Sequence, residues 1–300
     1  MLFSVFTPCY NSSKTLEACF ECLKWQTYKN FEWILVDDCS PDGGKTRELI
    51  KKISREAPFT VKYYFFEENH FGARSMHKAC EIAAGEYLFL LDHDDIFTGN
   101  ALERVAWYIA NYCNGEVVAV RPRCVSEKGL LLGPSYRKKI FISTEGEMRY
   151  NEGMMAELMT AGRTEVMKEA AAHMQPGYTY AFLMAKISEK YKMVYPDEAL
   201  RIYDMSVPTS FSNNRSVNTR FPQAKVDQYF YLWQSYSAYV HKNLLQTLRE
   251  MMHTHSLIHR YKLKPSGYKL KAPLLKILFY LTAPAGIIKS LVFKMTGKKI

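Results

Sequence analysis

The first 125 residues alternate short β-rich apolar runs with stretches of helical periodicity, and this alternation restricts the fold more than any other feature. Five runs have the length and composition of strands, at positions 2–7, 31–37, 61–66, 86–91 and 116–121. Between two of them, Leu16, Phe20 and Leu23 recur at helical spacing. Strands that alternate with helices predict a mainly parallel sheet with crossover helices. Runs such as WILV and YLFLL are apolar on both faces, which indicates helices on both sides of the sheet.

The second half of the chain has a different pattern. Residues 126–215 are less regular, with one helix predicted over 178–191 and one short strand in YPDEALRIY. Apolar residues then recur at helical spacing from Val226 to Met252, which predicts one long amphipathic helix. The sequence therefore predicts an α/β unit over 1–215, divided near residue 125, and a helical C-terminal extension over 216–300.

The positive charge of the chain is confined to its tail. The formal net charge is +10, from 40 basic and 30 acidic residues, and ten Lys or Arg but no Asp or Glu follow Glu250. Residues 1–250 are therefore neutral, which is not the pattern of a nucleic-acid-binding body. In the tail, lysines flank Leu, Phe and Tyr, as in segments that lie on anionic membrane surfaces. An RNA-binding or a partner-binding tail is the alternative.

Three further expectations concern this tail and the compartment. The uncharged stretch 277–288 is shorter than the roughly 18 residues that a spanning helix needs, and we expect Pro273 and Pro284 to divide the tail into short helices. His253, His255 and His259 lack a carboxylate partner for a metal and should add to the positive charge. An odd number of cysteines (seven) and a start without a signal peptide predict a cytoplasmic protein. The basic tail, residues 260–300, predicts that this protein binds peripherally to the inner face of the cell membrane.

Polar side chains follow three of the predicted strands, in the segments 7–11, 37–43 and 91–95. The carboxyl ends of parallel strands meet at one edge of a sheet, so these segments should form one site. Asp92, Asp94 and Asp95 bring together carboxylates that repel one another unless a cation lies between them. Mg²⁺ or Mn²⁺, held by one or two carboxylates and a substrate diphosphate, fits this pattern. The alternatives are a general acid/base pair and, for any one segment alone, a helix cap.

Together, SVFTPCYNSSKTL, WILVDDCSPDGG and AAGEYLFLLDHDD resemble the N-terminal half of glycosyltransferase family 2, nucleotide-sugar-dependent enzymes of GT-A fold. The resemblance covers residues 2–112 strongly and extends weakly, through KYKMVYPDEALRIY, to about residue 203. It implies a GT-A-type, Rossmann-like sheet with a nucleotide-binding half (1–125) and an acceptor half (126–215). It also implies that Asp38 binds the nucleotide base and that Pro8 and Tyr10 line the same pocket. LDHDD would be the D-x-D motif, with Asp92 at the ribose and metal shell and Asp94 as the direct ligand of Mn²⁺ or Mg²⁺.

Two positions depart from the common family pattern. Arg74 follows the third strand and is placed to reach the base or phosphates, but the family's A-R-N-x-G is incomplete here, and a solvated arginine at a helix start is the alternative. Inverting members also place an acidic residue before the helix that precedes the final strand, where it deprotonates the acceptor. Segment 172–178 contains no carboxylate. Glu169, His173 and Asp204 are weak candidates, and the base stays unassigned.

The resulting hypothesis is a metal-dependent glycosyltransferase. It would move a sugar from a nucleotide-diphosphate sugar to a glycan or glycolipid acceptor, most simply a lipid-linked surface glycan, with inversion. The processive Q-x-x-R-W motif is absent, which favours addition of single sugars. The alternative, suggested by the missing base, is a catalytically impaired nucleotide-sugar-binding or scaffolding protein at the membrane.

Overall fold

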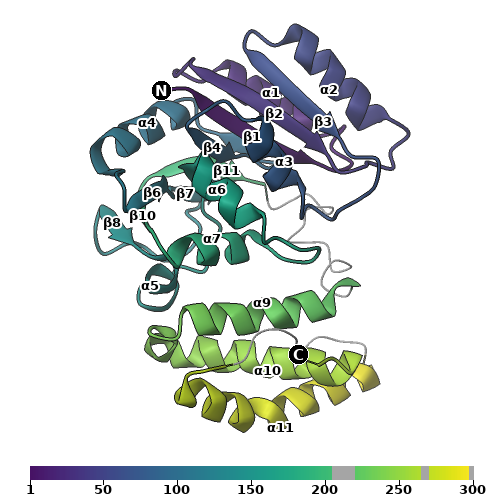
Figure 1. Ribbon diagram of the computed structural model, residues 1–300, viewed down its shortest axis with the longest axis vertical. Coiled ribbons are helices and arrows are strands. Elements are labelled where there is room, and N and C mark those ends of the chain that lie inside the picture. Colours follow the sequence, from purple (N-terminus) through teal and green to yellow (C-terminus); the bar gives the residue numbers. More distant parts are fainter. Residues whose placement is uncertain (205–219, 265–269, 297–300) are drawn as a thin grey trace.

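The computed structural model describes residues 1–204, 220–264 and 270–296. A sheet flanked by helices forms the larger part of the molecule, and three long helices lie below it (Figure 1). The expected boundary at residues 215 and 216 falls outside the described residues.

The main sheet has eight strands in the order β3-β2-β1-β4-β9-β6-β10-β8. They are β1 (Phe3–Cys9), β2 (Phe31–Asp37), β3 (Thr60–Phe65), β4 (Tyr87–Leu90), β6 (Val117–Val120), β8 (Ile140–Ser143), β9 (Thr160–Arg163) and β10 (Lys192–Pro196). Neighbours among the first four are parallel, β9 is antiparallel to both β4 and β6, and β8 is antiparallel to β10. The mainly parallel α/β prediction is confirmed, and all five predicted strands exist with ends shifted by no more than two residues.

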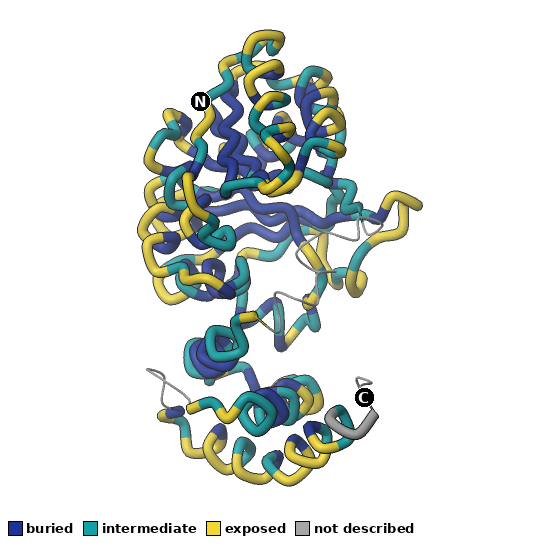
Figure 2. Tube along the Cα trace, turned by 90° about the vertical axis from the view of Figure 1, so that its right-hand side faces the viewer, coloured by how far each residue is buried: buried dark blue, intermediate teal, exposed yellow. Residues whose placement is uncertain are grey.

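Helices cover both faces of the sheet, as the doubly apolar strands predicted. In β2, Trp33 and Leu35 pack into one core, and Ile34 and Val36 pack into the other. The first core lies under α1 (Leu16–Lys24), α2 (Lys45–Glu56) and α4 (Ala101–Tyr112). The second lies under α3 (Ser75–Ile82), α6 (Thr164–Ala171) and α7 (Tyr180–Ser188). In Figure 2 the strands form a continuous buried layer between more exposed helices.

A small second sheet supports the site. Its order is β5-β11-β7, with β5 (Ile96–Phe97), β11 (Ala199–Tyr203) and β7 (Arg123–Ser126). The short strand predicted in YPDEALRIY is β11, and the first two residues of this segment end β10, which belongs to the main sheet. The middle strand β11 places the buried side chain of Arg201 close to the end of β4.

The single long helix predicted over 226–252 is wrong. The chain forms α9 (Pro222–Ser235), a 3₁₀ turn (Val240–Asn243) and α10 (Leu244–Tyr261). Asn243 begins α10 by accepting a hydrogen bond from the backbone N–H of Gln246 at 3.3 Å. The apolar spacing continued across the break because both helices line one core, which includes Trp233 and Met251.

The tail prediction also needs correction. Pro284 lies inside one continuous helix, α11 (Pro273–Thr296). By length and composition, the 21-residue segment Pro273–Phe293 of this helix could cross a membrane. Its 18-residue apolar stretch has a mean hydropathy of 1.5, and 22% of that stretch is buried. The lysines within the helix made the apolar stretch look shorter than the helix that contains it.

Helix α11 packs along α10 through the tail histidines. His255 Nε2 lies 2.7 Å from the carbonyl oxygen of Phe279, and His259 Nδ1 lies 3.1 Å from the Ser290 hydroxyl. Burial lowers the pKa of His255 and so disfavours its charged form, against the expectation that it adds to the positive charge of the tail. These histidines join two helices.

Candidate functional site

Backbone strain gathers at the carboxyl ends of the first three strands. Asn11, Cys39 and Phe71 have φ values of 54°, 59° and 54°, and they follow β1, β2 and β3 respectively. Non-glycine residues rarely adopt this left-handed conformation, and such residues concentrate at functional sites. The loops at this edge are therefore candidates for a functional site.

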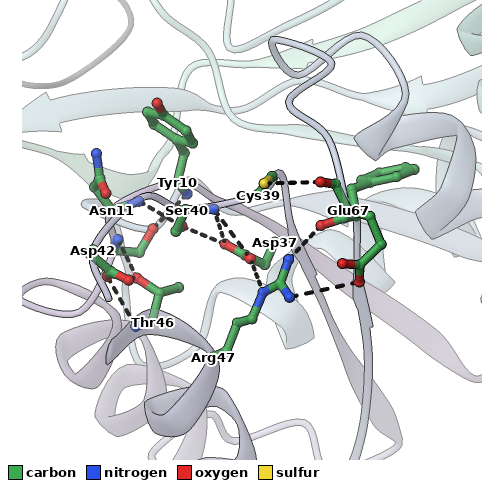
Figure 3. A network of polar contacts seen from close by, with 11 residues as sticks. Tyr10, Asn11, Asp37, Cys39, Ser40, Asp42, Thr46, Arg47 and Glu67 are labelled. Carbon is green, nitrogen blue, oxygen red and sulfur yellow. Dashed lines mark hydrogen bonds and ion pairs between the residues drawn. The ribbon is translucent and has the colours of Figure 1, made fainter. Parts of the chain in front are cut away.

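A polar network ties the loops after β1 and β2 together (Figure 3). The buried Asp37 carboxylate accepts hydrogen bonds from the Ser40 hydroxyl and from Arg47 Nε, the latter at 2.9 Å. The Ser40 hydroxyl in turn accepts the backbone N–H of Asn11 at 2.9 Å. The ring of Tyr10 points away from this network and is 43% exposed, while the network holds the loop beneath it.

Asp38 is buried and holds the loop that follows β3. Its two carboxylate oxygens accept the backbone N–H groups of His70 at 2.8 Å and Gly72 at 2.7 Å. A carboxylate has about four acceptor positions, so Asp38 can accept another hydrogen bond from a ligand. Pro8 is half-buried near the end of β1. Arg74 is exposed at the start of α3, and its guanidinium has no partner among the described residues.

The D-x-D segment surrounds one buried arginine. Arg201 Nη1 lies 3.6 Å from Asp92 Oδ2, its Nε lies 3.4 Å from Asp95 Oδ2, and its Nη2 lies 3.0 Å from Glu157 Oε1. Burial raises the pKa of Asp92 to about 7 and that of Asp95 to about 8, while the charge of Arg201 opposes both shifts. In the described part of the chain, Asp95 Oδ2 and Arg201 Nη1 are buried without a hydrogen-bond partner. The cluster is polar and incompletely satisfied, with Arg201 and Asp95 buried and Asp92 and Glu157 open to solvent.

Asp94 is half-buried like Asp92, but it differs from Asp92 and Asp95 because no described residue bonds to its carboxylate. No three His, Cys, Asp or Glu side chains come together as a metal site within the ranges described above. Mg²⁺ and Mn²⁺ often take only one or two carboxylates and complete their shell with water and phosphate. The oxygen donors of Asp94 and Asp92 fit such a site.

The candidate bases lie in two places. Glu169 is exposed on α6 and pairs with Lys190 at 2.6 Å, and it shares a small surface pocket with His173. That pocket contains no residue of the strand ends. Asp204 instead follows β11, and its backbone N–H donates to Asp95 Oδ1 at 3.1 Å. The structure thus brings Asp204 to the D-x-D segment and leaves Glu169 and His173 on another surface.

Sequence reasoning missed Arg201 and Glu157. Arg201 occupies an apolar strand, ALRIY, and an arginine in such a run is a signal because a buried charge needs partners. No local sequence pattern pointed to Glu157, because its partner Arg201 is 44 residues away in the chain.

Curated relatives match about a third of the chain. The amylovoran biosynthesis glycosyltransferase AmsB of Erwinia amylovora is 33% identical over 102 residues, which are 34% of this chain and 34% of that protein. The UDP-Glc:alpha-D-GlcNAc-diphosphoundecaprenol beta-1,3-glucosyltransferase WfgD of Escherichia coli is 34% identical over 102 residues, 34% of this chain and 38% of WfgD. The matched region is thus little more than a third of either relative.

Solved structures match over nearly the whole chain at low identity. S. aureus TarS 1–349 in complex with UDP-GlcNAc has a TM-score of 0.66 at 16% identity, covering 99% of this chain and 93% of that one. The mannosyltransferase PcManGT of Pyrobaculum calidifontis, with GDP-Man and Mn²⁺, has a TM-score of 0.58 at 16% identity, covering 99% and 88%. These likenesses establish the GT-A fold. A family model described as glycosyl transferase family 2 matches residues 4–170, more than half of the chain, and the chain therefore belongs to this family.

Proposed function

We propose that this chain transfers a sugar from a nucleotide-diphosphate sugar to a glycan or glycolipid acceptor, with inversion and with Mn²⁺ or Mg²⁺. One observation carries the proposal: Tyr10, Asp38, Asp92 and Asp94 follow the ends of neighbouring parallel strands. Ligands of such sheets bind at this edge. The names of AmsB and WfgD refer to polysaccharide synthesis and to a diphosphoundecaprenol-linked sugar, which supports a lipid-linked surface glycan as the acceptor.

Each residue has a role that follows from its surroundings. Asp38 accepts a hydrogen bond from the base while it holds the loop at His70 and Gly72. Tyr10 and Pro8 line the nucleoside pocket, and Arg74 extends a free guanidinium towards the phosphates. Asp94, with Asp92, would hold the cation, which when bound neutralises charge on the diphosphate leaving group.

We also propose that the enzyme works in the cytoplasm at the inner face of an anionic membrane. The outward side of α11 exposes Ile277, Tyr280, Leu281 and Ile288, and Lys276 and Lys289 lie on the same helix. Apolar side chains beside lysines suit the boundary between head groups and acyl chains. Of the tail residues 260–300, Lys269, Lys298 and Lys299 lie outside the described residues.

The rival function is a nucleotide-sugar-binding scaffold without transfer activity. It is favoured by the segment 172–178, which has no carboxylate to act as a base. The two functions share the donor site and differ only in whether an acceptor reacts.

A panel of nucleotide sugars tests the proposal. We expect one donor to raise the melting temperature only when Mn²⁺ or Mg²⁺ is present, and to be converted to nucleoside diphosphate when a lipid-diphosphate-linked sugar is added. The matching nucleoside without phosphates, a control for base binding alone, should not show the metal dependence. Binding without transfer to any acceptor in the panel would support the scaffold, and no binding would overturn both.

A further inference from the structure

The small sheet places one unassigned carboxylate near the D-x-D segment. Leu158 forms an isolated antiparallel bridge with Arg123 of β7, just before β9 begins at Thr160. The adjoining Glu157 pairs with Arg201 of β11, the strand next to β7, and Arg201 also pairs with Asp92. Glu157 comes from the acceptor half of the chain, opposite the residues assigned to the nucleotide.

Arg201 fixes Glu157 without enclosing it. The ion pair between Arg201 Nη2 and Glu157 Oε1 is 3.0 Å long, and the Glu157 side chain remains 43% exposed. Arg201 also faces Asp92 and Asp95, so one positive charge is shared among three carboxylates. Glu157 therefore has one side oriented by Arg201 and one side open to solvent.

The start of α7 lies at the same place. Tyr180, the first residue of α7, is close enough to Glu157 and Asp92 for both charges to act on its hydroxyl. Segment 172–178 leads into this helix and contains no carboxylate. Glu157, in the segment before β9, thus brings a carboxylate to the start of α7.

We propose that Glu157 is the base that activates the acceptor, an inference that rests on the proposed transferase function. The Glu157 carboxylate takes the proton of the acceptor hydroxyl as the acceptor oxygen forms a bond to the anomeric carbon of the sugar. The bond from that carbon to the diphosphate oxygen breaks, and its electron pair leaves with the nucleoside diphosphate. The protonated Glu157 then gives its proton to water. Arg201 is a positioning residue, because it orients Glu157.

The first test is Glu157→Gln in the full chain with the donor, metal and acceptor found in the panel. We expect kcat for transfer to fall by about 10²–10⁴-fold, the usual contribution of a positioned base. Binding of nucleoside diphosphate and metal, measured by calorimetry, should change by less than about twofold. Glu165→Gln is the matched control, because Glu165 is 78% exposed and pairs only distantly with Arg163, at 4.0 Å.

The rival carboxylates are tested in parallel. Glu169→Gln should keep most of the transfer activity, and Asp204→Asn, beside the D-x-D segment, should lose less of it than Glu157→Gln does. If Asp204→Asn loses transfer while Glu157→Gln keeps it, the base is Asp204 and the proposal is wrong. Loss of nucleotide binding in Glu157→Gln would also overturn it, because the residue would then serve the donor or the fold.

Chemical rescue separates a base from a structural residue. Formate should restore part of the transfer activity of Glu157→Ala in proportion to its concentration, since a small carboxylate can occupy the space left by the side chain. It should not restore Asp94→Ala. No rescue, with a folded variant, would refute the proposal. A wild-type protein that binds donor and transfers nothing would instead refute the transferase function itself.

Discussion

Two buried carboxylates in this molecule have opposite surroundings. Glu250, in α10, accepts hydrogen bonds from Arg149 at 2.7 Å, Gln246 at 2.9 Å, Trp233 at 3.0 Å and Tyr150 at 3.4 Å. Asp95, after β4, has one oxygen with no hydrogen-bond partner in the described part of the chain, although Arg201 lies 3.4 Å away.

We interpret the difference as one between a structural charge and a functional one. Buried polar groups are normally satisfied, and Glu250 joins α5 (Glu145–Tyr150), α9 and α10 into one body through such bonds. Arg149 Nε beside Glu250 also has no partner in the described part of the chain, so the contrast lies in the two carboxylates. The open oxygen of Asp95 supports the proposal that its cluster serves a bound ligand. Substitutions in the helical region, at the nucleotide site and in α11 test these roles.

The largest effect is expected for Glu250→Ala. The substitution leaves the Arg149 guanidinium buried without its counter-charge, which costs about 3–5 kcal/mol of unfolding free energy. Urea unfolding followed by circular dichroism measures this loss, with Glu165→Ala as an exposed control expected within about 0.5 kcal/mol of wild type. An unchanged midpoint would show that the helical region does not depend on this ion pair.

Asp94→Ala should leave stability nearly unchanged and remove metal-dependent activity. The carboxylate has no described partner to lose, but without it the diphosphate charge is poorly stabilised, and we expect transfer to fall by about 10²–10³-fold. Calorimetry with nucleoside diphosphate and Mn²⁺ reports binding, and thermal melting reports the fold. If the variant binds nucleoside diphosphate as tightly as the wild type does, with the same metal requirement, the D-x-D assignment is refuted.

Asp38→Ala should weaken nucleoside diphosphate binding by about 1–3 kcal/mol, the cost of removing a charge-assisted hydrogen bond. The loop at His70 and Gly72 also loses its acceptors, whereas Asp38→Asn keeps one acceptor oxygen and should bind with intermediate affinity. Metal binding should be the same in both variants. A matching loss of metal-only binding would place Asp38 in the cation site instead.

The smallest effect is expected for single lysines of α11. Lys276→Gln or Lys289→Gln should weaken binding to anionic vesicles by about 1 kcal/mol each. Substitution is preferred to deletion of the tail, because the buried Leu275 and the contact between Phe279 and His255 belong to the helical core. Co-sedimentation with anionic and neutral vesicles measures the change. Equal sedimentation of wild type and variants with both lipids would argue against the membrane proposal.

The sequence by itself determined the sheet and the polar edge. Strands such as 31–37 are recognisable because burial on both faces leaves a run of apolar residues that is local in the chain. Asp38, Asp92 and Asp94 could be proposed as site residues for the same reason, since each directly follows a recognisable strand or belongs to a short motif. The charge of the tail is likewise a property of composition alone.

Tertiary structure decided what depends on distant neighbours. Only folding brings Glu157 and Arg201 to Asp92, and only the packing against α10 reveals α11 as one helix that contains Pro284. The break after α9 was hidden because one core buries both α9 and α10, so the apolar spacing ran on across the turn. Apolar periodicity indicates which side of a segment is buried, but it does not indicate which other element that side packs against.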